Sequence, residues 1–305
     1  MIETSVGAAR GAVLMPATAR SAVQEVSGGD GFPCPAGSAG DLHANDTICG
    51  LTGFDKAARR FELFYHCRLG ALRVHLNAQG ASRMIQIRPK FITFDCYGTL
   101  TCFRMGDLAR TMFADRISAA RMDQFVKDFS GYRFDEVLGA WKPYVDVLKS
   151  ALERTCRRHG IAYREEEGQA YYDAVPSWGP HPDVPAPLKK VAQHYPLVIL
   201  SNAANSQIQT NVDKLEAPFH AVFTAEQAQA YKPRMQAFEY MLDMLSARPE
   251  DLLHVSSSLR YDLMTAHDLG IRDKVFVARG HEPSTPYYGY YQIADIGGLP
   301  ALLGL

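Results

Sequence analysis

A strand that runs directly into an acid constrains this chain more than any other feature. Residues 91–100 read FITFDCYGTL, so four apolar or β-branched residues precede Asp95 and a Gly-Thr turn follows it. A continuous apolar run is typical of a strand that is covered on both faces, as in a parallel sheet. A carboxylate at the end of such a strand is costly to bury. We therefore predict a buried strand at 91–95 that holds a reactive Asp95.

Helix and strand patterns alternate from residue 89 to the C-terminus. This alternation predicts a parallel sheet with helices on both faces. The run YYGYY at 287–291 is predicted as a packed or surface strand. The other predicted strands are 197–202, 219–223, 251–257 and 274–278, and the predicted helices are 188–195, 205–215, 234–246 and 260–269.

Residues 104–182 form a helical insertion after the first strand. The segment 141–160 places Val145, Leu148 and Leu152 on one apolar face. The prolines of 176–187 then predict a loop, because proline bars helix continuation. An insertion at this point lies over the carboxyl edge of the sheet, where such folds bind ligands.

The predicted fold class is therefore α/β: a Rossmann-like, doubly wound parallel sheet at 89–103 and 183–305, with an inserted all-helical cap at 104–182. Residues 1–83 differ from the rest, because their first half is rich in Gly, Ala and Ser and has no sustained period. We therefore predict a poorly ordered extension at 1–88. A helix at 55–76 that binds a partner or a surface is one alternative. Another is that Met84 is the natural start.

Charge and cysteine usage exclude several classes of function. A formal net charge of −1 gives no electrostatic footprint for nucleic acid or an anionic membrane. No apolar run reaches the ~18 residues of a membrane span, and the N-terminus lacks a secretory signal pattern. The six cysteines form no CxxC pair and the histidines no HxxxH pair, so we expect neither a disulfide framework nor a metal site. These features favour a reduced, cytoplasmic protein.

Polar residues follow four of the predicted strands. Because the carboxyl ends of parallel strands meet in one crevice, these residues are expected to form one site. A carboxylate that attacks, a cation that keeps it ionised and hydroxyls that bind an anion make a nucleophilic site. Each group also has a structural explanation, such as a helix N-cap or a first-turn carboxylate, but their order along the chain favours the site. The polar residues of this expected site are Asp95 to Thr99, Ser201-Asn202, Lys232-Pro233, and Ser256 to Ser258 followed by Asp262.

This combination resembles the haloacid dehalogenase superfamily of hydrolases, and DCYGT more narrowly resembles its (S)-2-haloacid, or type II, dehalogenases. The resemblance covers residues 88–305. The phosphatases of the superfamily carry an acid two residues after the nucleophile, where this chain has Tyr97, and an acidic metal ligand where it has Ser257. Phosphoryl transfer needs magnesium, around which a hydroxyl replaces a carboxylate poorly. The resemblance therefore implies displacement at carbon, without a metal or organic cofactor.

The implied reaction begins when Asp95 attacks C2 of an (S)-2-haloalkanoate and expels halide. Water then hydrolyses the ester on Asp95 and releases an (R)-2-hydroxy acid. Lys232 is expected to oppose the effect of burial on the pKa of Asp95. The resemblance assigns Lys232 and Asp262 to the charged network, Thr99 and Ser257 to hydrogen bonds that support Asp95, and Ser201 and Asn202 to the substrate carboxylate.

The chain also departs from the well-known dehalogenases. Phe238 stands where they carry a tyrosine, and Leu259 where they carry an asparagine. Arg133 is favoured over Lys127 as the cap residue that receives the halide, with Trp178 and Tyr97 beside the substrate. A homodimer is implied by resemblance alone. The alternatives are another alkyl electrophile or ester as substrate, a magnesium-dependent phosphatase of the same superfamily, and a non-catalytic binding protein on this fold.

Overall fold

Six parallel strands form the centre of the part of the chain that the computed structural model describes, residues 88–305. The strand order is β3-β2-β1-β4-β5-β6, so the chain winds outward from β1 on one side and then crosses to the other. Ile92 pairs with Leu197 on one side and Leu253 on the other, which places β1 at the centre. The strands are β1 Phe91–Phe94, β2 Leu197–Ser201, β3 Ala221–Thr224, β4 Leu252–Ser256, β5 Asp273–Val277 and β6 Tyr291–Ile293.

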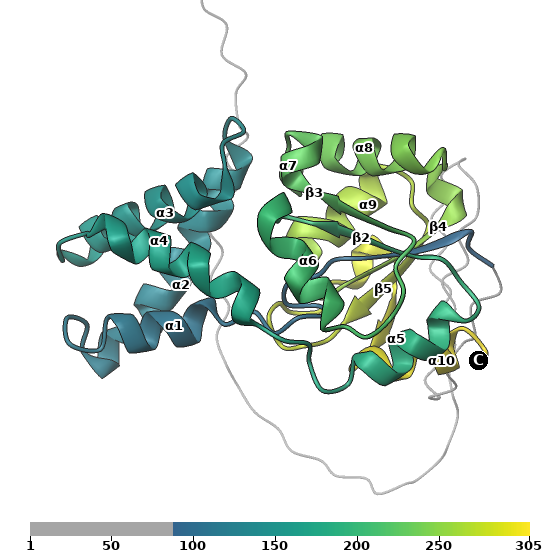
Figure 1. Cartoon of the computed structure of the whole chain (residues 1–305), viewed down its shortest axis with the longest axis horizontal. Helices are drawn as coiled ribbons and strands as arrows, with labels where there is room; N and C mark the ends of the chain where they lie inside the picture. The colour runs from purple at the N-terminus through teal and green to yellow at the C-terminus, as the bar shows by residue number, and fades with distance from the viewer. Residues whose placement is uncertain (1–87) are drawn as a thin grey trace, which may run out of the picture. The chain divides into compact units, whose positions relative to one another are not determined.

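Helices cover both faces of this sheet (Figure 1). Successive residues of β2 alternate between the faces: Leu197 and Ile199 pack with α5, α6 and α10, whereas Val198 and Leu200 pack with α8 and α9. This arrangement confirms the predicted doubly wound fold. The core helices are α5 Pro185–Ala192, α6 Asn205–Asp213, α7 Ala225–Ala228, α8 Met235–Leu245, α9 Met264–Asp268 and α10 Leu299–Leu302.

Four helices between β1 and α5 form the expected cap. Figure 1 draws them as a separate group beside the sheet. Phe113, Phe125, Phe129 and Tyr171 are buried in the cap's own apolar core. The two linkers run antiparallel to each other, because Cys102 N–H donates to Gly179 O at 2.9 Å and His181 N–H donates to Leu100 O at 2.9 Å. The cap helices are α1 Met105–Met112, α2 Ala119–Leu138, α3 Tyr144–His159 and α4 Glu165–Ala174, followed by a 3-10 turn at Val175–Ser177.

Three local predictions need correction. The run at 287–291 is not a strand: Pro286–Tyr288 forms a 3-10 turn, Gly289 has a left-handed φ of 57°, and β6 begins only at Tyr291. The helix predicted at 260–269 begins as a π turn, Leu259–Leu263, before α9. The loop predicted at 176–187 is shorter than expected, because α5 begins at Pro185 and not at residue 188. Proline at the first helical position loses no hydrogen bond.

The helix α7 lies within a segment whose sequence predicted none. The Thr224 hydroxyl accepts from Gln227 N–H, and the Gln227 amide oxygen accepts from Thr224 N–H, so a capping box starts this short helix.

The expectations for the extension, including the helix at 55–76, fall outside the described residues. Within residues 88–305, no helix is long and apolar enough to cross a membrane. Cys96, Cys102 and Cys156 are free thiols.

Candidate active site

The central strand delivers Asp95 to the point where the strand order reverses. Asp95 N–H donates to Val255 O at 3.1 Å, which extends the β1–β4 pairing by one residue. The chain then turns, because the N–H groups of Leu100 and Thr101 both donate to Cys96 O. Gly98 takes a left-handed φ of 94° in this turn. The turn brings the Thr99 hydroxyl to 2.7 Å from Asp95 Oδ2, to which it donates.

Lys232 lies between two buried carboxylates. Its Nζ donates to Asp95 Oδ1 at 2.8 Å, to Asp262 Oδ1 at 2.7 Å and to Leu200 O at 2.8 Å. All three donors of the ammonium group are therefore satisfied, and the side chain is only 1% exposed. Asp95 and Asp262 are likewise buried. The sequence motifs therefore meet in one charged group, as predicted.

Asn202 holds the backbone of Lys232. Its amide nitrogen donates to Lys232 O at 2.9 Å, and its amide oxygen accepts from Lys232 N–H at 2.7 Å. The side chain also lines the cavity and keeps a second amide N–H, so its contact with substrate stays a prediction. Ser201 differs, because its Oγ is buried without a hydrogen-bond partner among residues 88–305 and lines the same cavity.

Two further side chains fix Asp262. His254 Nε2 lies 3.1 Å from Asp262 Oδ1, and Ser256 Oγ donates to Asp262 Oδ2 at 3.0 Å. On its other side, His254 Nδ1 lies 2.8 Å from Thr93 Oγ1. Since an ionised carboxylate only accepts, His254 donates through Nε2. His254 was missed in the sequence, although a histidine inside an apolar strand signals a buried polar contact.

Asp95, Lys232 and Asp262 shift one another's pKa values. Burial raises the pKa of Asp95 above its ordinary value and the charge of Asp262 adds to this, while Lys232 and Thr99 oppose it. Burial alone would raise the pKa of Asp262, but Lys232 and His254 outweigh burial and lower it. Burial would lower the pKa of Lys232, but the two carboxylates raise it. The predicted influence of Lys232 on Asp95 is thus present, but burial is larger.

Ser257 supports Asp95 only through Thr99. Its N–H donates to Thr99 Oγ1 at 2.9 Å, and its Oγ lies 3.1 Å from the same atom. The sequence predicted that Ser257 supports Asp95 by hydrogen bonds, and in the structure the connection between the two residues passes through the Thr99 hydroxyl. Ser257 nevertheless lines the cavity beside Asp95.

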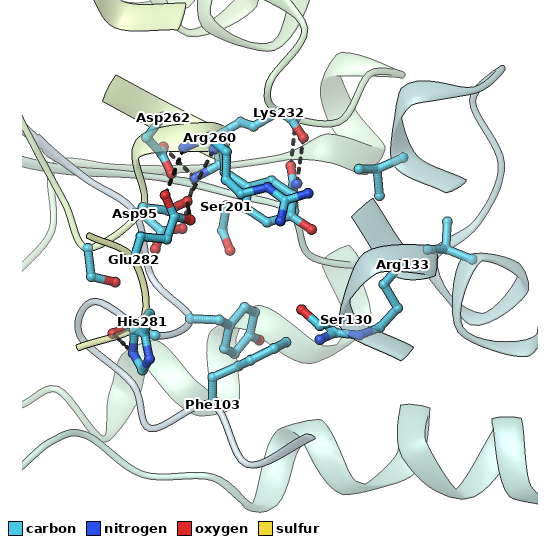
Figure 2. Close-up of a pocket in the computed structure, with 18 of the residues that line it drawn as sticks. Asp95, Phe103, Ser130, Arg133, Ser201, Lys232, Arg260, Asp262, His281 and Glu282 are labelled. Carbon is cyan, nitrogen blue, oxygen red and sulfur yellow. Dashed lines mark hydrogen bonds and ion pairs between the residues drawn. The ribbon is translucent and has the colours of Figure 1, made fainter. Parts of the chain in front are cut away.

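A cavity of about 330 Å³ opens beside Asp95, lined from the core and from the cap. Figure 2 shows Asp95, Lys232 and Asp262 on one side of it and Ser130 and Arg133 of α2 on another. Val137, Tyr144 and Val147 add an apolar wall from the cap. A cavity that is lined by both apolar and charged side chains suits a small organic anion.

Tyr97 lines the cavity, and a side chain outside the cavity lining holds its hydroxyl group. Its hydroxyl donates to Asn211 Oδ1 at 2.8 Å, and burial raises its pKa. The Trp178 ring packs edge-on against Tyr97 and Phe103, with centroid distances of 6.2 and 5.3 Å. Trp178 itself does not line the cavity, so it supports the wall where the sequence suggested contact with substrate.

Of the two candidates on α2, Arg133 lines the cavity and Lys127 does not. The Arg133 guanidinium carbon lies 5.0 Å from the ring centroid of Phe103 and 5.1 Å from that of Phe129. Lys127 is exposed to solvent. The geometry therefore favours Arg133, the preferred candidate.

The two residues at which this chain departs from the well-known dehalogenases, Phe238 and Leu259, lie outside the cavity. Phe238 is fully buried, with its ring centroid 5.3 Å from that of His254. Leu259 packs with Leu263 and Phe276. Apolar residues at these places fill the core.

Arg260, His281 and Glu282 line the cavity but were not predicted. The Glu282 carboxylate accepts from Ser258 Oγ at 2.7 Å, from Leu259 N–H at 2.8 Å and from Arg260 N–H at 3.1 Å. It thus supplies partners to the free N–H groups where the π turn begins. His281 and Glu282 lie in a loop after β5, for which no periodic pattern exists.

Comparison with known proteins agrees with this geometry. A family model described as haloacid dehalogenase-like hydrolase matches residues 89–270. The chain therefore belongs to the haloacid dehalogenase-like hydrolases. A search of curated proteins found no match.

Solved structures share the fold. The L-2-haloacid dehalogenase from Xanthobacter autotrophicus, with chloropropionic acid covalently bound, is 20% identical, with a TM-score of 0.59 over 71% of this chain and 99% of the other. The putative HAD-hydrolase YfnB from Bacillus subtilis, bound to magnesium, is 17% identical, with a TM-score of 0.62 over 72% and 100%. At these identities the likeness concerns the fold alone.

Proposed function

We propose that this hydrolase cleaves the carbon–halogen bond of an (S)-2-haloacid. The observation that carries the proposal is the charged group of Asp95, Lys232 and Asp262. Two residues after Asp95, the proposed nucleophile, the chain has Tyr97 and not a second acid. The Tyr97 hydroxyl is bonded to Asn211 and has a raised pKa, so it is poorly suited to protonate a leaving group. A departing halide needs no proton, which makes displacement at carbon compatible with this site.

The proposed reaction has two steps. An oxygen of Asp95 attacks C2 from the side opposite the halogen, the carbon–halogen bond breaks, and halide leaves with the electron pair. Water then attacks the Asp95 carbonyl carbon, and the bond from this carbon to the oxygen now on C2 breaks. One proton of the water goes to that leaving oxygen, which becomes the hydroxyl group of the product, and the other passes through the charged network to solvent. The carboxylate is restored and an (R)-2-hydroxy acid leaves, with inversion at C2.

Residues around the cavity supply the supporting roles. The unpartnered Ser201 hydroxyl suits the substrate carboxylate, and the Arg133 guanidinium suits the leaving halide. Thr99 orients Asp95 Oδ2. Lys232 opposes the rise that burial causes in the pKa of Asp95 and so favours its ionised form. The resemblance also supports a homodimer, which sedimentation velocity would measure.

Incubation with (S)-2-chloropropanoate tests the proposal. We expect release of chloride and formation of (R)-lactate, and Asp95→Ala should abolish both. Asp123→Asn, which changes an exposed carboxylate on α2, is the matched control and should keep activity. In a single turnover in ¹⁸O water, the label should enter Asp95 before the product. Label that appears directly in the lactate, with none in the protein, would exclude the ester.

A magnesium-dependent phosphatase is the second candidate, because the YfnB structure of this fold is bound to magnesium. The donor set fits magnesium poorly: Ser257 offers a hydroxyl, and both Asp262 oxygens already accept from Lys232, His254 and Ser256. Hydrolysis of p-nitrophenyl phosphate that stops on addition of a chelator, with no chloride from the haloacid, would favour the phosphatase. A binding protein would show neither activity.

A further inference from the structure

Two guanidinium groups line the cavity without a carboxylate partner. Arg133 comes from α2 of the cap and Arg260 from the π turn after β4, and Figure 2 shows both beside the cavity. No ion pair joins either side chain to a carboxylate of residues 88–305. Arg133 Nε is also buried without a hydrogen-bond partner in this part of the chain.

The carboxylates of the same cavity are already engaged. Asp95 and Asp262 share the ammonium of Lys232. Glu282 accepts from one hydroxyl and two backbone N–H groups at the start of the π turn. Neither arginine is paired with these carboxylates, so the N–H groups of both guanidinium groups remain available to an anionic ligand. Arg133 suits the halide, which leaves Arg260 without a role in the proposed reaction.

Arg260 is exposed, but its guanidinium group packs against an aromatic ring. Its guanidinium carbon lies 3.7 Å from the ring centroid of Phe134, which belongs to α2. Phe134 in turn packs edge-on against Tyr261 at 5.0 Å. A guanidinium fixed in this way loses less side-chain freedom when it binds an anion. The cavity of about 330 Å³ belongs to the size range of organic ligand sites, so it also has space beyond the reacting carbon.

We propose that Arg260 binds a second anionic group of the substrate, so that the preferred substrates are 2-halo dicarboxylates. This inference rests on the proposed dehalogenation. The first carboxylate lies next to C2 and binds near Ser201, and the distal carboxylate accepts hydrogen bonds from Arg260. The chemistry at C2 is unchanged: the carbon–halogen bond breaks and halide leaves.

Two four-carbon probes isolate the distal group. (S)-2-Chlorosuccinate and (S)-2-chlorobutanoate differ only in a terminal carboxylate or methyl group. We expect the wild-type chain to show a kcat/KM about tenfold higher for chlorosuccinate, corrected for spontaneous chloride release, with (R)-malate as product. Arg260→Gln should lower this ratio about tenfold, mainly through the KM of chlorosuccinate, since a charge-assisted contact is lost.

Two further variants serve as controls for the role of Arg260. Arg260→Lys keeps the charge and should retain part of the preference. Arg248→Gln changes an arginine whose side chain is 71% exposed, at the other end of β4, and should leave the ratio unchanged.

Three results would overturn the inference. A wild-type preference for chlorobutanoate would exclude a distal anion site while leaving the dehalogenation intact. An equal effect of Arg260→Gln on both probes would mean that Arg260 binds the carboxylate next to C2. Absence of chloride from both probes and from 2-chloropropanoate would reject the proposed function, and the substrate class with it.

Discussion

Lys232 carries one positive charge between two buried carboxylates, so it cannot neutralise both. Asp262 has the lowered pKa and additional donors in His254 and Ser256, whereas Asp95 has the raised pKa. This asymmetry gives the two acids different properties. Asp262 stays ionised and holds the ammonium group, and Asp95 is the more basic of the two and the better placed to act as a nucleophile beside the cavity.

The first prediction concerns the pH dependence of kcat/KM. Attack requires ionised Asp95, so activity should fall as the pH decreases through its raised pKa, with a midpoint above the ordinary value of about 3.9. Lys232→Met removes the main influence that lowers this pKa, so the midpoint should move to higher pH. The rate at neutral pH should fall roughly 100- to 1,000-fold. Initial chloride release from pH 3 to 10 measures both effects.

Lys232 should not limit activity on the alkaline side. The two carboxylates raise its pKa above the ordinary value of about 10.4, so it stays protonated at neutral pH. Lys189→Met, which changes an exposed residue of α5, should leave the profile unchanged. An acid midpoint at or below the ordinary aspartate value would contradict the assignment.

At the scale of elements, α2 decides which cation faces the cavity. Lys127 and Arg133 are six residues apart, and at about 100° per residue they lie about 120° apart around the helix. Only Arg133 lines the cavity. Arg133→Gln should lower kcat/KM for (S)-2-chloropropanoate about 100-fold, because the developing halide charge loses its donor. Lys127→Gln is the matched control and should stay within about twofold, so equal losses in the two variants would refute this orientation of α2.

The core strands and the charged group were predictable because their signals are local. Continuous apolar runs mark β1 and β2, and the polar residues that follow them must meet at one edge of a parallel sheet. The positions of Arg260 and Glu282 were not predictable, since they depend on how the loop after β5 returns to the π turn. Trp178 was predicted near the substrate, but its packing behind Tyr97 depends on tertiary contacts.

At the scale of the whole molecule, Arg279 joins three distant segments. Its Nε donates to Thr99 O at 2.8 Å in the turn that follows Asp95. Its two terminal nitrogens donate to the carboxylate oxygens of Asp183, at the end of the second cap linker, at 3.0 and 2.8 Å. Asp183 also accepts from Ile296 N–H at 2.9 Å. A single guanidinium therefore connects the turn after Asp95, the cap linker and, through Asp183, the C-terminal segment.

This connection should contribute to stability in a pH-dependent way. Burial would raise the pKa of Asp183, but Arg279 and Ile296 N–H outweigh burial and lower it. An acid with a lowered pKa in the folded state stabilises the protein above its unfolded pKa of about 3.9, and this contribution disappears as the pH falls through the folded value. The Arg279 side chain is 8% exposed and that of Asp183 22%, so solvent screens the pair only in part.

Arg279→Met should therefore lower the free energy of unfolding by about 2–3 kcal/mol at pH 7, somewhat less than the loss of a fully buried partner. The difference from wild type should shrink at pH 3, because this pH lies below the ordinary aspartate pKa of about 3.9, so Asp183 of the variant, which lacks Arg279, can take up a proton and no longer leaves an unpaired charge. Urea unfolding at the two pH values measures both quantities. Arg248→Met, in an exposed ion pair with Glu250, is the matched control and should change stability by less than about 0.5 kcal/mol. A loss that is equally large at both pH values would assign the role of Arg279 to its packing and its bond to Thr99 O, and not to the ion pair with Asp183.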